Sequence, residues 1–447
     1  MRLILCGSQD INLQILQSFT KFFDESSAPA NVLAKYKKNF WIVVNKFSNA
    51  EKQDLCFFWT GSPNLPSTEE GFQPLPTIMI RPADDLHLPT ANTCISRFLT
   101  MSTSPSSNSP LTQFQLLINS SEEDLIQPLN AFFETFFAMN DSISIEQWDM
   151  ALPSDSEREQ MKELISFLMN TDDFGKISSD STLLSRVAPL LVKSIQLTFI
   201  KNRFCVVHEL LPPSERFKRF WGYLVLCSPA YCNSNRTRLH HSSPHFLTDG
   251  DVCNQTAAIF ERTGSRSLVV AGATRYSVRG NLTSSCQPRN AIADAAHNNL
   301  TMFHTMCVGV FEASNEGIFM QWHGQQSCPQ SGAFISAGAK GTNPIYKDKE
   351  AYVNKLVSTV NKLVGEDIAT TPLQDRKCSL VASTNVFGRI VNGVEEENAC
   401  EGKADPKNVT GNFIHIEQQR KYRDDWASNL SYIPLKLDIL DPLDKCN

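Results

Sequence analysis

The stretch HLPTANTC, residues 87–94, ends in a cysteine that follows a proline-containing loop. It comes after the apolar run TIMIR, residues 77–81, which has a proline on each side and predicts a β-strand. A loop that leaves a strand in this way presents its side chains at a surface. Cys94 is therefore either a nucleophile or, like most single cysteines, a small buried apolar group.

Spacing alone leaves both roles open and favours the inert one. A free cysteine has a pKa of about 8.5, so only a few per cent is thiolate at neutral pH. His87 and Thr93 are the candidates for stabilising the thiolate of Cys94. Asp84 and Asp85 are candidates for acid/base or positioning groups.

The sequence around this stretch forms a series of blocks in a fixed order, namely LILCGSQDIN (3–12), FWIVVNKFS (40–48), LCFFWTGSPNLP (55–66), EGFQPLP (70–76) and MIRPADDLHLPTANTCISR (79–97). In this order and spacing, residues 1–98 resemble the C-terminal part of a HECT-type ubiquitin-protein ligase of the hyperplastic-discs type. The first thirty or so residues look like the end of that family's N-lobe. The rest look like most of its C-lobe, an α+β segment.

The resemblance implies that Cys94 accepts ubiquitin as a thioester, with His87 and Thr93 at loop positions beside it and Phe72 in the lobe's core. Such covalent catalysis divides one difficult acyl transfer into two easier ones. The implied partners are ubiquitin, a ubiquitin-conjugating enzyme and a protein substrate, and no cofactor is needed. The implied location is the cytoplasm or nucleus.

The continuation after Cys94 departs from the family pattern. The family continues with a strand, a helix and a short tail, whereas here ISR is followed by FLTMSTSPSSNSP. Most of the N-lobe, which docks the conjugating enzyme, is also missing from the resemblance. We therefore expect ubiquitin transfer by this chain alone to be impaired.

Four regions are predicted along the chain: an incomplete C-lobe-like segment at 1–100, a Ser/Pro-rich linker at 101–110, a helical region at 111–225 and a cysteine-rich α/β domain at 226–447. The helical region has Phe and Leu at helical spacing, which indicates core packing rather than catalysis. Pro189 is expected to break its last helix.

The overall composition excludes some classes of function. The formal net charge is -6 and no dense Lys/Arg stripe occurs, which argues against nucleic-acid binding. No apolar run is long enough to span a membrane. The apolar run at the N-terminus is too short for a signal peptide, so the chain is expected to start in the cytosol.

Cysteine usage points to a different compartment for the second half. Nine of the 13 cysteines lie between Cys227 and Cys446. Six glycosylation sequons also fall there, starting at Asn235, Asn254, Asn281, Asn299, Asn408 and Asn429. Both features are typical of extracellular-type domains.

The second half also contains blocks of possible metal ligands. They are SPHFLTDGD with His245, Asp249 and Asp251, IADAAHN with Asp294 and His297 at helical spacing, QWHGQQSC with His323, and FIHIEQQR with His415 and Glu417 on one face of a strand. Zinc takes such ligands and leaves a position open for water in catalytic sites. Arg275, just past an apolar strand, could hold a substrate carboxylate. Ordinary surface or core histidines remain the alternative.

The region 226–447 weakly resembles secreted domains akin to N-formylglutamate amidohydrolase and poly-γ-glutamate hydrolase, through SLVVAGATR, ADAAHNN, QWHG and FIHIEQ. This resemblance implies metal-assisted amide hydrolysis at His245, Asp251, His323 and Glu417. It also implies disulfides among Cys286, Cys328, Cys378 and Cys400, with the pairing left open.

Three hypotheses follow for the whole chain. It is a ubiquitin-transfer protein, or a metal-dependent hydrolase domain preceded by a HECT remnant, or a non-catalytic composite of two fused genes. The compartment separates the first two hypotheses. A transcript that runs unbroken through residues 95–115 tests the third.

Overall fold

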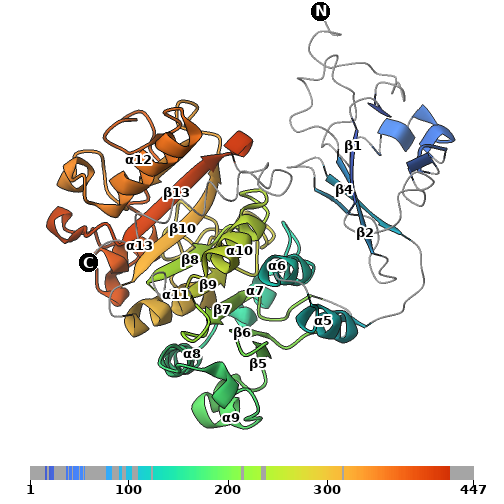
Figure 1. The fold of residues 1–447 in the computed structure, drawn as a ribbon, viewed down its shortest axis with the longest axis horizontal. Helices are drawn as coiled ribbons and strands as arrows, with labels where there is room; N and C mark the ends of the chain where they lie inside the picture. The colour runs from blue at the N-terminus through green and yellow to red at the C-terminus, as the bar shows by residue number, and fades with distance from the viewer. Residues whose placement is uncertain are drawn as a thin grey trace, which may run out of the picture. The chain divides into compact units, whose positions relative to one another are not determined.

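The computed structural model describes residues 109–121 and 124–422, apart from 213–215, 233–237 and 315–316, together with short stretches between residues 16 and 102. The chain divides into two compact units, Met1–Thr112 and Gln113–Asn447. Both units are drawn in Figure 1. Within the described residues, no helix is both long and apolar enough to cross a membrane.

The N-terminal unit contains a four-stranded sheet in the order β1-β2-β4-β3. The strands are β1 (Lys21–Asp24), β2 (Thr77–Pro82), β3 (Thr90–Asn92) and β4 (Arg97–Ser102). Strand β2 runs parallel to β1 and β4, and β3 is antiparallel to β4. The strand predicted at TIMIR is confirmed as β2. Described residues within 37–45 and 51–55 are helical, so this unit mixes helices and strands.

The linker predicted at residues 101–110 is shorter than expected. Met101 and Ser102 pair with Arg81 and Pro82 as the end of β4. Pro110 begins helix α5 (Pro110–Ile118). Proline is well tolerated in the first turn of a helix, because the N–H group that it lacks would have no partner within the helix there.

The C-terminal unit is built on a nine-stranded sheet in the order β12-β11-β13-β10-β8-β9-β7-β6-β5. The strands are β5 (Ile195–Ile200), β6 (Phe204–Glu209), β7 (Tyr223–Cys227), β8 (Leu239–Ser243), β9 (Ser267–Val270), β10 (Ile318–Gln325), β11 (Ala333–Ser336), β12 (Ala369–Thr370) and β13 (Phe413–Gln419). The central strands β9, β8, β10 and β13 are parallel. Strands β5, β6 and β7 extend the sheet antiparallel beyond β9.

The predicted division at residue 225, between a helical region and an α/β domain, is wrong. Strands β5 and β6 lie wholly within 111–225, and β7 crosses the division. These runs are rich in the β-branched and aromatic residues that favour strands. Strands β6 and β7 are buried along their whole length, so they lack the alternating pattern that identifies a half-exposed strand.

The first part of that region is helical as predicted, with α6 (Ile126–Glu134), α7 (Ile145–Ala151), α8 (Asp155–Met169) and α9 (Leu183–Val187). A reciprocal pair of bonds between Ser154 and Glu157 caps α8. The break expected at Pro189 is confirmed, because α9 ends at Val187 and a 3-10 turn follows. Strand β5 comes next, where the helical pattern was expected to continue.

Helices cover both faces of the nine-stranded sheet (Figure 1). Helices α8, α11 (Met302–Ala313) and α13 (Val386–Val391) contribute to the core on one face. Helices α6, α10 (Val252–Thr263) and α12 (Tyr352–Val364) contribute to the cores on the other. Side chains of β7 alternate between these cores, as the two-residue period of a strand requires. The unit is therefore a three-layer α/β/α sandwich.

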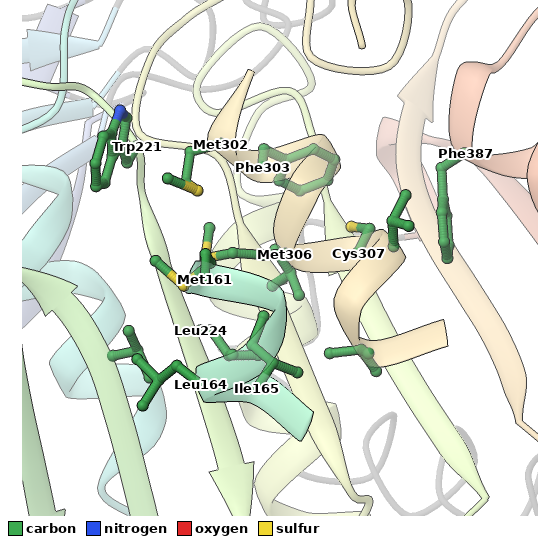
Figure 2. Close-up of a cluster of buried hydrophobic side chains, with 14 of the residues drawn as sticks. Met161, Leu164, Ile165, Trp221, Leu224, Met302, Phe303, Met306, Cys307 and Phe387 are labelled. Carbon is green, nitrogen blue, oxygen red and sulfur yellow. The ribbon is translucent and has the colours of Figure 1, made fainter. Parts of the chain in front are cut away.

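The largest core lies where α8 and α11 pack together over the sheet. Figure 2 shows Met161 and Ile165 of α8 among Met302, Phe303 and Met306 of α11. Close packing of the two helices depends on Gly309, since a Cβ atom there would lie 3.0 Å from Cδ1 of Ile165. A Cβ at position 309 would require the Ile165 side chain to shift by a few tenths of an ångström in a closely packed core.

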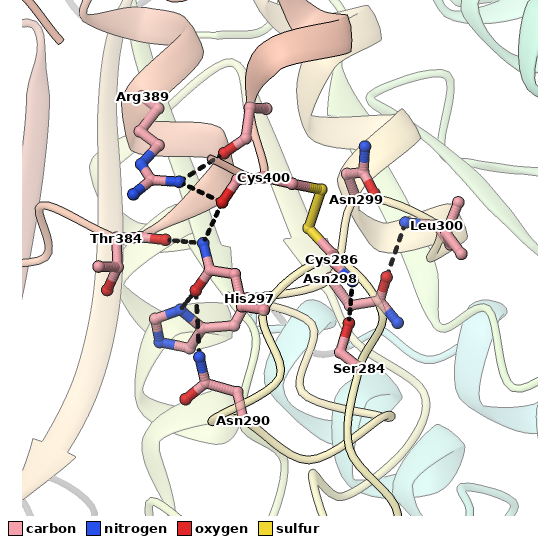
Figure 3. The surroundings of a disulfide bond; sticks show 12 residues. Ser284, Cys286, Asn290, His297, Asn298, Asn299, Leu300, Thr384, Arg389 and Cys400 are labelled. Atoms are coloured by element: carbon pink, nitrogen blue, oxygen red, sulfur yellow. Dashed lines mark hydrogen bonds between the residues drawn. A yellow bond between two sulfur atoms is a disulfide. The ribbon is translucent and has the colours of Figure 1, made fainter. Parts of the chain in front are cut away.

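Two disulfides join segments that are far apart in the sequence. Cys286 bonds Cys400 across 114 residues, and Cys328 bonds Cys378 across 50 residues. Figure 3 shows the first of these, beside Asn299 and Leu300. The structure confirms the four cysteines expected to form disulfides and supplies the pairing that the sequence left open.

Candidate metal centre

Three neighbouring strands bring polar side chains to one edge of the central sheet. Strand β10 is parallel to both β8 and β13. His245 follows β8 by two residues, His323 lies near the end of β10, and His415 and Glu417 lie on β13. His323 stands opposite Glu417 in the strand register. The carboxyl ends of parallel strands are the usual position for a site in a sheet of this type.

Three ligand-type atoms converge at this edge. Nδ1 of His245 lies 3.0 Å from Nδ1 of His323, and each of these nitrogens lies 3.1 Å from Oδ2 of Asp249. All three side chains are buried, with at most 5% of their surface exposed. Ligands of a tetrahedral zinc ion, at bond lengths of about 2.0–2.1 Å, lie about 3.3 Å apart. The observed separations are close to that value.

The short distance between the two imidazoles limits what can lie between them. Two facing Nδ1 atoms 3.0 Å apart need one proton or a cation between them, because two lone pairs at that distance repel each other. A cation placed between the two nitrogens and the carboxylate removes this conflict. The residues present therefore fit a divalent metal ion of the zinc type.

Asp249 reaches this position through a tight turn after His245. Leu247 and Gly250 both have positive φ angles, of 62° and 71°, and the turn brings the two residues together as a bridge. Gly250 adopts this conformation at little cost because it has no Cβ. The backbone N–H of Gly324 also donates to Oδ2 of Asp249, at 3.2 Å.

His415 and Glu417 form a second group of possible ligands, which shares His323 with the first group. Nε2 of His415 lies 3.6 Å from Oε1 of Glu417. Nδ1 of His415 is buried and has no hydrogen-bond partner among the described residues. A buried nitrogen without a partner is costly unless something binds to it. The centre thus has donors beyond the first three.

Arg275 balances the negative charge of Asp249 at the centre. Nη2 of Arg275 donates to Oδ1 of Asp249 at 2.9 Å and also to Nδ1 of His245, while Nε donates to Thr248 at 3.2 Å. Arg275 thus contacts the centre itself, and its expected role in holding a substrate carboxylate stays a prediction. Its side chain is 25% exposed, which makes it more accessible than the buried ligands.

Burial and neighbouring charges set the protonation states. Burial lowers the pKa of His323 to about 4 and that of His415 well below its ordinary value. Burial acts in the opposite direction on Asp294, but the charge of His245 and the hydrogen bond to it outweigh that effect and lower the Asp294 pKa. His245 differs, because burial and the charge of Arg275 are outweighed by the charges of Asp249 and Asp294, which raise its pKa. Metal binding would displace a proton from His245, whereas His323 and His415 are already in the neutral form that binds a metal.

The structure places the predicted metal ligands in two different settings. His245, His323 and Glu417 lie at the centre. Asp251 lies outside both ligand groups, at the N-cap position of α10, where it accepts a bond from Asn254 at 2.8 Å. Asp249 takes the carboxylate position beside the two histidines. Both aspartates belong to the block SPHFLTDGD, and only the geometry of the turn decides which of them lies beside the histidines.

Asp294 and His297 do not lie on a helix, contrary to the expected helical pair. They lie in a turn in which the N–H of His297 donates to the carbonyl of Asp294 at 3.0 Å. Nδ1 of His297 lies 2.9 Å from Oε1 of Gln287. His297 is thus bonded to Gln287, whereas Asp294 contacts His245 directly, with Oδ1 2.9 Å from Nε2.

The other predicted site falls outside the described residues. Cys94, His87, Thr93 and Phe72 all belong to that undescribed part of the N-terminal unit. In the chain, Cys94 comes between β3 and β4, whose antiparallel pairing places Asn92 opposite Arg97.

Comparison with known proteins gives matches at the N-terminal end of the chain. Residues 1–107 match the HECT-domain (ubiquitin-transferase) family. A relative is the E3 ubiquitin-protein ligase hyd of Drosophila melanogaster, 62% identical over 97 residues. That alignment covers 22% of this chain and 3% of the relative. The similarity is therefore to a small part of a much longer protein, and it ends close to the boundary between the two units.

Proposed function

We propose, from the premise that residues 1–107 are a HECT-type segment, that this segment functions in ubiquitin transfer, with Cys94 as the acceptor thiol. The observation that carries the proposal is this family match around the block LPTANTC. The Cys94 sulfur attacks the ubiquitin thioester of a conjugating enzyme, whose thiol leaves. A lysine amine of a protein substrate then attacks the new thioester and releases Cys94.

The roles of the neighbouring residues follow from the chemistry of the thiol. His87 and Thr93 are proposed to stabilise the thiolate of Cys94, which is the reactive form. Transfer by the 447-residue chain alone is proposed to be weak, because FLTMSTSPSSNSP replaces the family's usual continuation after the cysteine. This activity belongs to the reducing cytoplasm or nucleus.

A test of Cys94 should bypass docking of the conjugating enzyme. Ubiquitin activated as a small-molecule thioester should label the chain in a dithiothreitol-sensitive adduct. Cys94→Ala should abolish that adduct and Cys6→Ala should retain it. Labelling that survives Cys94→Ala would overturn the acceptor role. Efficient labelling by a charged conjugating enzyme would instead overturn the proposed impairment.

A second function is supported by the convergence of His245, Asp249 and His323 within 3.0–3.1 Å. We infer that these residues bind a zinc-type ion in the C-terminal unit and that the unit hydrolyses an amide bond. The resemblance to amidohydrolases stays a prediction. When bound, such an ion lowers the pKa of a water molecule and polarises a carbonyl.

The protein's own groups would supply the proton transfer. Glu417 lies opposite His323 in the strand register and would take a proton from an attacking water. His415, whose Nε2 lies 3.6 Å from Oε1 of Glu417, would accept a hydrogen bond from the protonated Glu417 or bind the substrate. Arg275 balances the buried negative charge of Asp249.

The two neighbouring aspartates allow a sharp test. The protein is stripped with a chelator and titrated with zinc chloride in a calorimeter. Asp249→Asn should abolish stoichiometric binding, since the carboxylate contacts both imidazoles. Asp251→Asn, two residues away but bonded to Asn254, should bind like the wild type. No binding by the wild type, or equal loss in both variants, would overturn the metal proposal.

The two functions favour different compartments. The disulfides Cys286–Cys400 and Cys328–Cys378 favour an oxidising environment, whereas a thioester on Cys94 needs a reduced thiol. The glycosylation sequons support an extracellular location less strongly than their number suggests. Asn254 of one sequon is buried in α10, and its amide donates to Glu134 and Asp251.

A further inference from the structure

Each ligand histidine has a fixed partner on the ring nitrogen that points away from the centre. Nε2 of His245 lies 2.9 Å from Oδ1 of Asp294, and Nε2 of His323 lies 3.0 Å from Oε1 of Gln321. Both partner atoms accept hydrogen bonds, so each Nε2 must carry the proton. In the neutral ring of His323, Nδ1 then presents a lone pair to the centre.

The orientation of the Gln321 amide is set by a helix cap on another element. Asn385 is the N-cap residue of α13, and its Oδ1 accepts a bond from the N–H of Gly388 at 2.8 Å. The amide nitrogen of Asn385 must therefore face the other way, where it donates to Oε1 of Gln321 at 2.5 Å. Gln321 must in turn present that oxygen, rather than its amide nitrogen, to His323.

The proton on Nε2 of His245 is fixed in the same way. Oδ1 of Asp294 also accepts from the N–H of Ala296, at 3.1 Å. On the other side of the ring, Nδ1 of His245 faces both a donor, Arg275, and an acceptor, Oδ2 of Asp249 at 3.1 Å. The contacts of His245 therefore assign a proton to Nε2 alone.

We infer that Gln321 and Asn385 are positioning residues, which fix His323 as the Nε2–H tautomer with its Nδ1 lone pair directed at the centre, and that Asp294 orients His245 through its Nε2–H. The assignment of the tautomer follows from the hydrogen bonds alone, whereas its effect on metal affinity rests on the proposed metal-binding function. Outer-shell partners of this kind commonly change metal affinity by about 10- to 100-fold when they are replaced.

One conservative substitution should reverse the direction of the hydrogen bonds that run from Asn385 through Gln321 to His323. In Asn385→Asp, one carboxylate oxygen keeps the bond to Gly388 and the other replaces the donor that faced Gln321. The Gln321 amide then turns its nitrogen toward both the new carboxylate and His323. His323 must respond by accepting at Nε2 and moving its proton to Nδ1, where it blocks a metal. In Gln321→Glu the partner still accepts, so the Nε2–H tautomer should persist.

A matched control lies at the other end of the same helix. Asn392, the C-cap residue of α13, is also buried, but its amide donates to the carbonyl of Ala337 at 2.9 Å. Asn392→Asp introduces the same substitution without touching Gln321. It should change neither the His323 tautomer nor the affinity for zinc.

The experiment reads tautomers directly in the chelator-treated protein. Long-range proton–nitrogen NMR of protein labelled with ¹⁵N-histidine distinguishes the two tautomers, and His323→Ala assigns the signal. We expect Nε2–H in the wild type, Gln321→Glu and Asn392→Asp, and Nδ1–H in Asn385→Asp. Zinc affinity, measured by chelator competition, should fall about 10- to 100-fold in Asn385→Asp alone.

The two readouts separate the possible failures. A wild-type His323 in the Nδ1–H form, or an Asn385→Asp variant that keeps the Nε2–H form, would overturn the positioning role. If the tautomers are as expected but neither the wild type nor any variant binds zinc, the positioning role of Gln321 and Asn385 stands and the metal function is overturned. Unchanged disulfides and circular dichroism of Asn385→Asp would show that a lost affinity does not come from unfolding.

Discussion

At the residue scale, the buried carboxylate of Glu261 joins two helices. It comes from α10, and one of its oxygens, Oε2, accepts the backbone N–H groups of Leu125 and Ile126 at 2.8 and 2.6 Å. These amides belong to the start of α6, where backbone donors have no partner within the helix. Burial raises the pKa of Glu261 to about 7.

The raised pKa predicts a stability that depends on pH. A carboxyl group with a higher pKa in the folded state stabilises the fold fully below its unfolded pKa, and this contribution is lost as the pH rises through about 7. Glu261→Gln keeps an oxygen for both amides and removes the titration. Relative to this variant, the wild type should lose about 3 kcal/mol of unfolding free energy between pH 4.5 and 8.

Chemical denaturation of both proteins across that pH range measures the difference. Glu163→Gln, on the exposed face of α8, is the control and should follow the wild-type pH dependence. A constant difference between wild type and Glu261→Gln at all pH values would contradict the prediction.

At the element scale, the two disulfides form nested loops, with the Cys328–Cys378 loop inside the Cys286–Cys400 loop. Loop-closure entropy predicts a stabilisation of about 4 kcal/mol for the 50-residue separation and about 5 kcal/mol for the 114-residue separation. Replacing both cysteines of one pair by alanine should lower the unfolding free energy by these amounts without dithiothreitol. Cys232→Ala, outside either disulfide, should have a smaller effect. Equal unfolding midpoints with and without reductant would show that the bonds contribute nothing.

Some elements could be predicted from the sequence and others could not, for physical reasons. The strand β2 and the capped helix α8 carry local signals, namely flanking prolines and a reciprocal Ser–Glu cap. Strands β6 and β7 are buried on both faces and read as apolar runs, which periodicity does not distinguish from buried helices. The boundary predicted at residue 225, between a helical region and an α/β domain, is wrong for that reason.

The candidate metal centre shows the same division between local and long-range information. His415 and Glu417 could be placed on one strand face from their spacing alone, and the structure places both at the centre. The choice between Asp249 and Asp251 depends on the positive φ angles of Leu247 and Gly250, which the residue types do not determine. The contact between His245 and Asp294 spans 49 residues and has no local signal.

At the scale of the whole molecule, the two units carry separate evidence for function. The HECT similarity lies in the N-terminal unit and the ligand cluster in the C-terminal one. The match to the Drosophila relative covers 22% of the chain, so it bears on the first unit. Each proposed activity is therefore tested at its own residues, Cys94 for one and Asp249 for the other.

The position of β13 has a consequence for how the C-terminal unit is made. It comes last in sequence among the described strands, yet it lies inside the sheet, between β11 and β10. On the ribosome, β11 and β12 emerge before the strand that connects them to the rest of the sheet. The strands β11 and β12 can join the rest of the sheet only after residues 413–419 have been synthesised. These residues also carry His415 and Glu417. A nascent chain that stalls before residue 413 would hold two unjoined half-sheets with exposed edges, a form suited to chaperone binding rather than to chemistry.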